Sequence, residues 1–404
     1  MQTERAALDG IDTAASGQAL AGKPHRRIAD IEVLRGLAVI SVVVQHAHGN
    51  LFMHCPPWME YFFAHFAWWF GVDLFFAISG FVIARDLVPT LNPCRSHAEF
   101  FHHALSFWIR RAFRLLPSAW LWLALMLLAS AVFNQAGYFG SARTNLAATL
   151  AGILNFANFR FADCFFKYPY GSSFAYWSLS LEEQFYLLFP VLIFLCRRWL
   201  AGVLLLGIVL QFCLVRTPLL MVVRTDALML GVLLAMTEGR SIYLKLQPVF
   251  LSQSRLIRVL VVALLLTLMG VMASDAFGLF RFRVGIIALC SASLVWLASY
   301  DRDYIMGDSV LKRCLLYVGS RSYAIYLIHV PTFFFIREIV YRWGPGADAA
   351  SWQMNLGLGL SAFALIVCLS EFNYRCVETP LRARGKRLAG RLRLPAVQFI
   401  AQPG

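Results

Sequence analysis

The sequence predicts an all-α polytopic membrane protein, and three observations support this class. Hydrophobic residues make up 59% and charged residues only 14% of the 404 positions, whereas soluble domains carry about 25% charged residues. The apolar residues form runs of about 20, the length that crosses a bilayer core. The basic residues behind the net charge of +14 gather at the ends of these runs, where they set topology. This distribution argues against a nucleic-acid-binding surface.

The apolar runs define about ten membrane spans. They cover residues 32–49, 66–85, 113–133, 179–196, 199–215, 218–237, 256–274, 282–299, 315–336 and 353–374. With the N-terminus placed inside, most Lys and Arg fall in cytoplasmic connections, as the positive-inside rule requires. We therefore expect both termini to be cytoplasmic. Segment 145–160 would move the basic C-terminal tail outside if it were an eleventh span, so we expect a peripheral or re-entrant helix there.

Other segments flank or interrupt the predicted transmembrane domain, residues 28–376. Residues 1–27 are rich in Ala, Gly and polar residues, which predicts a disordered cytoplasmic tail. Residues 377–404 form a basic cytoplasmic tail. The outer connection 134–178 is long enough to form a lid or a binding surface. Cys55 and Cys164 would both face the outside, as a disulfide or as two free thiols.

Arg35 and His46 are ionisable residues within the first predicted span. Eleven residues at about 100° each return to the same helix face, with a rise of about 16 Å. Arg35 therefore lies near the cytoplasmic boundary, and His46 lies on the same stripe in the outer half. Each also has a structural interpretation. Arg35 could be a boundary anchor paired with Glu32, and His46 an interfacial histidine.

Charged residues also enter the second and third spans. Asp73 lies in the outer half of the second span, where an unpaired carboxylate is costly in lipid. Arg111 and Arg114, three positions apart on one helix face, enter the third span from the cytoplasm. Topology anchoring would explain Arg111, but Arg114 lies one turn deeper, where a fork of donors suits a phosphate.

Glu182 and Glu183 stand at the start of the fourth span, after Ser178 and Ser180. Ser180 and Glu183 have the spacing of a capping box, which would give one glutamate a structural role. Capping explains a second adjacent glutamate less well. Both carboxylates are therefore candidate site residues.

Six stretches, taken in order, resemble the membrane-bound acyltransferase family 3, the bacterial O-acyltransferases of surface polysaccharide and lipopolysaccharide. They are IEVLRGLAVISVVVQH, GVDLFFAISGFVI, RRAFRLLP, YWSLSLEEQFYLLFP, RTDALMLG and GSRSYAIYLIH. The resemblance extends over nearly the whole chain. Some family members carry a fused C-terminal extracytoplasmic domain. Here only a basic tail follows the last span, so we expect any second, periplasmic transfer step to need a separate acyltransferase.

The resemblance implies an enzyme of the bacterial inner membrane that takes an acyl group, expected to be acetyl, from cytoplasmic acyl-CoA. The acceptor would be a hydroxyl of a glycan or a lipid-linked saccharide. The family's arginine positions match Arg35, Arg111 and Arg114, which would bind the phosphates of the donor. Its first-span histidine matches His46, the candidate general base; a covalent acyl-imidazole is the less favoured route.

The family's acidic pair matches Glu182 and Glu183, which would orient His46, a role that Asp73 could share. We expect membrane lipid around the protein and no metal in the chemistry. Two other classes stay open. Intramembrane charges also mark the pathways of transporters, so a saccharide or acyl-group flippase is the main alternative. A scaffold that keeps the fold without activity is the other.

Overall fold

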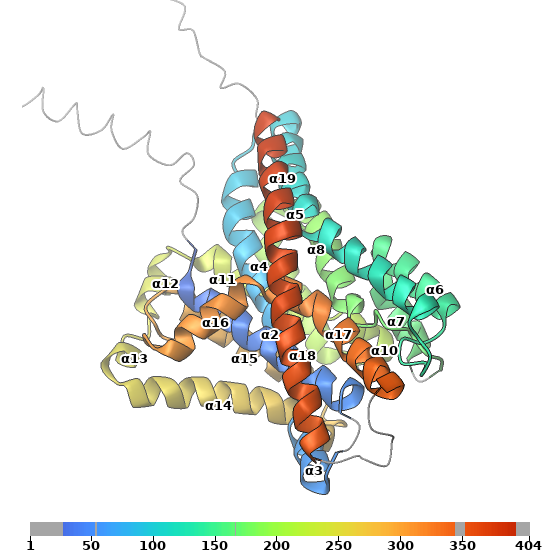
Figure 1. Cartoon of the computed structure of the whole chain (residues 1–404). Helices are drawn as coiled ribbons and strands as arrows, with labels where there is room; N and C mark the ends of the chain where they lie inside the picture. Colours follow the sequence, from blue (N-terminus) through green and yellow to red (C-terminus); the bar gives the residue numbers. More distant parts are fainter. Residues whose placement is uncertain (1–26, 53–54, 166, 344–351, 393–404) are drawn as a thin grey trace, which may run out of the picture.

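Helices make up most of the chain in the computed structural model, which describes residues 27–52, 55–165, 167–343 and 352–392 (Figure 1). These ranges contain no strand, so the predicted all-α class is confirmed. The longer helices are α2 (Ala29–Asn50), α4 (Phe70–Leu91), α5 (His97–Val132), α8 (Tyr176–Cys196), α9 (Leu200–Cys213), α14 (Arg255–Ala273), α15 (Arg283–Ser299), α17 (Ser322–Trp343) and α18 (Trp352–Asn373). Residues 1–26 of the predicted disordered tail lie outside the described ranges.

Shorter helices connect or extend the long ones. They are α3 (Pro57–His65), α6 (Ala142–Ile153), α7 (Ala157–Cys164), α10 (Pro218–Val222), α11 (Asp226–Thr237), α12 (Ser241–Lys245), α13 (Phe250–Gln253), α16 (Val310–Ser320) and α19 (Thr379–Arg391). A 3-10 turn, Arg197–Trp199, joins α8 to α9, and a second, Asp275–Phe277, follows α14. A π-helical turn, Tyr374–Glu378, joins α18 to α19.

Eight helical stretches of the described chain are long and apolar enough to cross a membrane. One of these stretches runs from Tyr176 to Cys213 and includes both α8 and α9, which were expected to be separate spans. Helix α15 is apolar but shorter than the others. The chain is therefore a polytopic membrane protein, while the count of ten spans and the cytoplasmic position of both termini remain predictions.

Several helix boundaries differ from the predicted spans. Helix α5 begins at His97 rather than near residue 113, because Ser96 accepts a hydrogen bond from the Glu99 amide and caps it. The expected span 315–336 is divided between α16 and α17. The expected span 353–374 corresponds to α18, and the helical chain then continues through the π-helical turn into α19.

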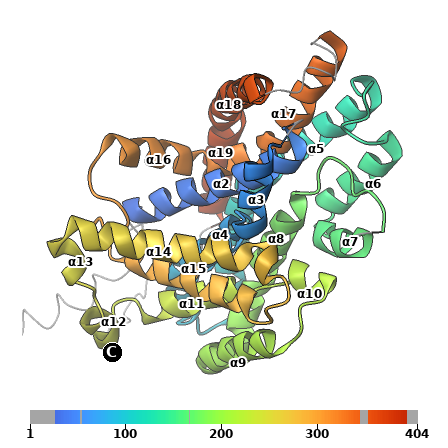
Figure 2. The same ribbon diagram turned by 90° about the horizontal axis from the view of Figure 1, so that it is seen from below.

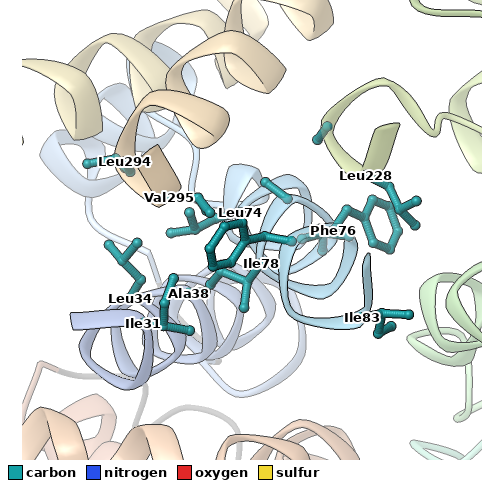
Figure 3. Packing of buried hydrophobic residues seen from close by; sticks show 14 of the residues in the cluster. Ile31, Leu34, Ala38, Leu74, Phe76, Ile78, Ile83, Leu228, Leu294 and Val295 are labelled. Atoms are coloured by element: carbon teal, nitrogen blue, oxygen red, sulfur yellow. The ribbon is translucent and has the colours of Figure 1, made fainter. Parts of the chain in front are cut away.

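The core is built where α2, α4, α11 and α15 pack together. Ile31, Leu34 and Ala38 of α2 face Leu74 and Ile78 of α4 in Figure 3, with Leu228 of α11 and Leu294 and Val295 of α15 on the other sides. Lipid tails are as apolar as these side chains, so close packing rather than escape from water must hold membrane helices together. Small residues at the crossings are therefore important.

Helices α4 and α11 approach each other most closely at two glycines. A Cβ atom at Gly80 would lie 2.0 Å from the backbone oxygen of Leu228. A Cβ atom at Gly231 would lie 2.1 Å from the backbone oxygen of Ala77. Backbone atoms cannot move aside as a flexible side chain can, so only glycine allows this crossing.

We expect Gly80→Ala to lower the stability of the purified protein by about 1–3 kcal/mol, the usual cost of overpacking. Gly202→Ala is the matched control, because a Cβ atom there has nothing within 4 Å. It should be neutral or slightly stabilising, since alanine favours a helix over glycine by about 1 kcal/mol. Thermal unfolding in detergent measures both. Equal midpoints for the two variants would contradict the close crossing.

Two helices lie in the connection 134–178, which was predicted to face the outside. Segment 145–160, expected to be a peripheral or re-entrant helix, is divided between α6 and α7. They lie beside α8, on the side of the molecule away from α14 (Figure 1 and Figure 2). The buried Asn145 ties the connection together, since its amide donates to the Phe139 carbonyl at 2.7 Å and accepts from the Ser172 amide at 2.9 Å. Burial also raises the pKa of Tyr170 in this connection to about 12.

Candidate active site

An internal cavity with about 70 Å³ of space lies where α2, α4, α5, α8 and α17 meet. Its charged lining consists of Arg35, Arg111, Arg114 and Glu182. All three arginines predicted to bind the donor therefore share one cavity with one of the two predicted carboxylates. The remaining wall is formed by hydroxyl-bearing and apolar side chains, including Ser79, Ser178, Tyr186 and Tyr326.

Arg35 reaches the cavity from the N-terminal half of α2. Its Nη1 lies 3.1 Å from Glu32 Oε1, one turn earlier, and both side chains are mostly buried. The pairing with Glu32 that a boundary anchor would make is therefore present. Arg35 also lines the cavity, so it can pair with Glu32 and still contact a ligand there.

Arg111 and Arg114 project from α5 toward α8. The Arg111 guanidinium carbon lies 5.1 Å from the centre of the Tyr186 ring and 5.5 Å from that of Phe107, a cation–π arrangement. Arg114 differs, because its Nε is buried without a hydrogen-bond partner among the described residues. Buried donors in native proteins are almost always satisfied, so an unpaired one is a sign of a ligand or water.

Glu182 is held on the cavity wall by two hydroxyl groups. Ser79 Oγ and the Tyr186 hydroxyl both donate to its Oε1. Glu183 points elsewhere and accepts a hydrogen bond from the Asn155 side chain. The capping box expected from Ser180 and Glu183 is not formed, because α8 already begins at Tyr176 and Ser180 Oγ accepts from the Ala157 amide instead.

His46 is paired with His329 of α17. Its Nδ1 lies 2.7 Å from His329 Nε2. His329 is fully buried, and its Nδ1 lies 3.2 Å from the backbone oxygen of Ile325. Tyr326, which lines the cavity, has its ring centre 5.6 Å from that of His329. The histidine pair is thus connected to the cavity through Tyr326.

Glu182, Glu183 and Asp73 were each predicted to orient His46, but each carboxylate has another partner in the structure. Asp73 is fully buried and accepts two hydrogen bonds from Arg224, at 2.8 Å from Nε and 3.0 Å from Nη2. A lone carboxylate at this depth would be costly, and the bidentate pair removes that cost. The orienting position beside His46 is occupied by His329.

Candidate metal ligands gather away from the cavity. One group consists of His48, Cys55 and Glu60, and another of Cys94, Glu99 and His103. His48 Nε2 lies 3.4 Å from Glu60 Oε2, so the first group already contains a polar pair. Cys55 and Cys164 are both free thiols. The cavity itself presents guanidinium, carboxylate and hydroxyl groups, a set suited to a phosphorylated anion rather than to a metal.

No role in the site was predicted from the sequence for His329, Tyr186 or Ser79. His329 stands in the stretch SYAIYLIH, but its partner is 283 residues away in the sequence. Tyr186 could have been inferred, since it stands four residues after Glu182 on one helix face. The contact of Ser79 with Glu182 joins two helices, and no local pattern indicates it.

Fold and site together define a polytopic helical membrane protein with an arginine-lined cavity beside a histidine pair. A family model described as an acyltransferase domain matches residues 28–371, so the chain belongs to the acyltransferase 3 family. No solved structure matches the chain.

Two curated relatives show the extent of the similarity. The O-acetyltransferase OatA of Staphylococcus aureus is 24% identical over 394 residues, which cover 89% of this chain and 58% of the relative. The peptidoglycan O-acetyltransferase OatA of Listeria monocytogenes is 25% identical over 391 residues, which cover 89% of this chain and 57% of the relative. The chain thus spans just over half the length of these relatives.

Proposed function

We propose that the protein is an O-acyltransferase that moves an acyl group, expected to be acetyl, from acyl-CoA to a hydroxyl group. The observation that carries the proposal is the single cavity shared by Arg35, Arg111, Arg114 and Glu182, connected through Tyr326 to the His46–His329 pair. Guanidinium groups suit the phosphates of a CoA donor. A histidine pair suits proton transfer.

The hydrogen bonds of the histidine pair support one arrangement of its protons. A carbonyl oxygen can only accept, so His329 Nδ1 carries a hydrogen that it donates to Ile325. In the neutral ring, His329 Nε2 is then an acceptor, and His46 Nδ1 must donate to it. His46 Nε2 is left with a free lone pair. This is the form that a general base requires.

In the reaction we propose, His46 first accepts a proton and later donates it. Its Nε2 takes the proton of the acceptor hydroxyl while the hydroxyl oxygen attacks the carbonyl carbon of the thioester. The carbon–sulfur bond then breaks, and the departing CoA thiolate receives the proton from the imidazolium. His329 keeps His46 in the productive tautomer, as the third member of a catalytic triad does for its histidine. Glu182 holds Tyr186, on whose ring Arg111 lies.

The acceptor is proposed to be a glycan or a lipid-linked saccharide at the bacterial inner membrane. Support comes from the names of the relatives, one of which is a peptidoglycan O-acetyltransferase. The donor would be bound from the cytoplasm, where the predicted topology puts the three arginines. A separate periplasmic acyltransferase is the proposed partner for any second transfer step.

The donor site predicts the effect of removing its arginines. Arg111→Ala and Arg114→Ala should each weaken CoA binding by about 10- to 100-fold, since a hydrogen bond to a charged group is worth about 1.5–3 kcal/mol. The measurement is the shift in the thermal unfolding midpoint with added CoA. Arg143→Ala, an exposed position on α6, is the control. If CoA stabilises all three variants as it does the wild type, the two arginines of α5 are only topology anchors.

A further inference from the structure

Helix α19 packs along α5, the helix that carries Arg114 (Figure 1). A Cβ atom at Gly385 would come 2.4 Å from Cβ of Phe113, the residue next to Arg114, so the two helices are in close contact. The chain reaches this position through the π-helical turn Tyr374–Glu378. Such turns within helices are frequent at functional sites. The predicted basic tail is thus in part a helix packed against the site.

Glu378, the last residue of the π-helical turn, lies within electrostatic reach of several arginines. Its side chain is buried, and four arginines act on its charge: Arg114, Arg382, Arg35 and Arg27. Arg35 already has Glu32 as a partner. The single carboxylate of Glu378 therefore stands against three further guanidinium groups, which leaves an excess of positive charge.

Arg382 illustrates this excess directly. It lies on α19 and is partly buried, within electrostatic reach of Arg114 and Arg27 as well as of Glu378. Like charges at close range repel one another, and partial burial strengthens that repulsion. A group of arginines with too few carboxylates is the arrangement that an anion with several negative charges would neutralise.

Two unsatisfied atoms in the same cluster provide an independent indication of a ligand. Glu378 Oε2 and Arg114 Nε are both buried without a hydrogen-bond partner among the residues that the structure describes. Buried polar atoms left unpaired in a native protein call for a water, an ion or a ligand. Arg114 belongs both to this cluster and to the cavity wall. One ligand would therefore extend from the cluster into the cavity.

We infer that Arg382, together with Arg114, binds the phosphates of the donor's nucleotide end, beside the buried carboxylate of Glu378. The inference rests on the proposed function, because it assigns the cluster to the same donor. It extends the donor site from α2 and α5 to α19. The acyl end would occupy the cavity, and the nucleotide end would lie between α5 and α19.

The test compares two donors that differ in their phosphates. Acetyl-CoA carries them, whereas S-acetylpantetheine has the same thioester arm and none. For Arg382→Ala in the full chain, we expect kcat/KM for acetyl-CoA to fall by about tenfold or more, through KM, as for loss of a charged hydrogen bond. The value for S-acetylpantetheine should stay at the wild-type level. Arg384→Ala, an exposed position on the same helix, is the control and should change neither.

The outcomes separate the inference from the function on which it rests. An equal loss for both donors, or no loss for acetyl-CoA, would overturn the role of Arg382. Arg382→Lys keeps the charge but not the guanidinium fork, so it should retain part of the acetyl-CoA affinity and serves if the alanine variant does not fold. A wild-type protein that uses neither donor would instead overturn the proposed acyltransferase function itself.

Discussion

His46→Ala is expected to lower acyl transfer by about 10²- to 10⁴-fold, the usual contribution of a general base. The physical reason is that the variant lacks the imidazole proposed to take the proton of the acceptor hydroxyl as it attacks the thioester. CoA should still raise the thermal unfolding midpoint of the variant, because the donor arginines are intact. The measurement is transfer from labelled acetyl-CoA by purified protein in detergent. Transfer at the wild-type rate by a folded variant would contradict the assignment.

His329 provides the matched control for the role of His46. His329→Gln offers an amide oxygen that can accept from His46 Nδ1, whereas His329→Leu offers no acceptor. We expect transfer to decrease from wild type to the Gln variant and further to the Leu variant. The loss should be in kcat, with KM for acetyl-CoA unchanged, because His329 acts through His46. Equal activity of the two variants would show that the hydrogen bond has no part in catalysis.

Removing one partner of the Asp73–Arg224 pair is expected to have the largest effect on stability. Asp73→Ala and Arg224→Ala should each cost about 3–5 kcal/mol, because each leaves a buried charge without its partner. Arg224 also lies against two aromatic rings, with its guanidinium carbon 4.9 Å from the centre of the Trp177 ring and 5.1 Å from that of Trp69. Thermal unfolding in detergent is the measurement.

Two controls accompany these variants: the double variant at positions 73 and 224, and a variant that breaks an exposed ion pair. Asp73→Ala combined with Arg224→Ala should cost less than the sum of the single changes, since no lone charge remains. Lys167→Ala breaks a pair whose two side chains are 64% and 63% exposed, so it should change stability by about 1 kcal/mol at most. Additive losses at positions 73 and 224, or losses as small as that at Lys167, would contradict the buried pair.

Helix positions could be predicted from the sequence wherever an apolar run coincides with a helix. The approach fails where a helix continues in polar sequence. Helix α5 begins at His97 because Ser96 caps it, and α19 is basic but packs on α5 through Gly385. It also fails between α16 and α17, where the apolar run passes through a helix break. Apolar periodicity reports which segments are buried, not where the backbone hydrogen bonds begin or end.

The candidate site was predictable in its residue types but not in its pairings. The stretches LRGLAVISVVVQH and RRAFRLLP identify Arg35, Arg111 and Arg114, which do share a cavity. The partners of His46 and Asp73 are 283 and 151 residues away in the sequence. A single sequence contains no signal for such distant contacts. The orienting role was therefore predicted for nearby carboxylates, whereas the structure puts His329 beside His46.

Acyl-CoA and a saccharide hydroxyl are proposed to react within this membrane domain. The most direct test is to reconstitute the purified chain in liposomes with labelled acetyl-CoA on one side and a saccharide acceptor on the other, and to measure label on the acceptor. We predict labelled acceptor with the wild type, together with free CoA, and almost none with His46→Ala. Acceptor that crosses the membrane unlabelled, without any need for acetyl-CoA, would contradict the account and indicate a transporter.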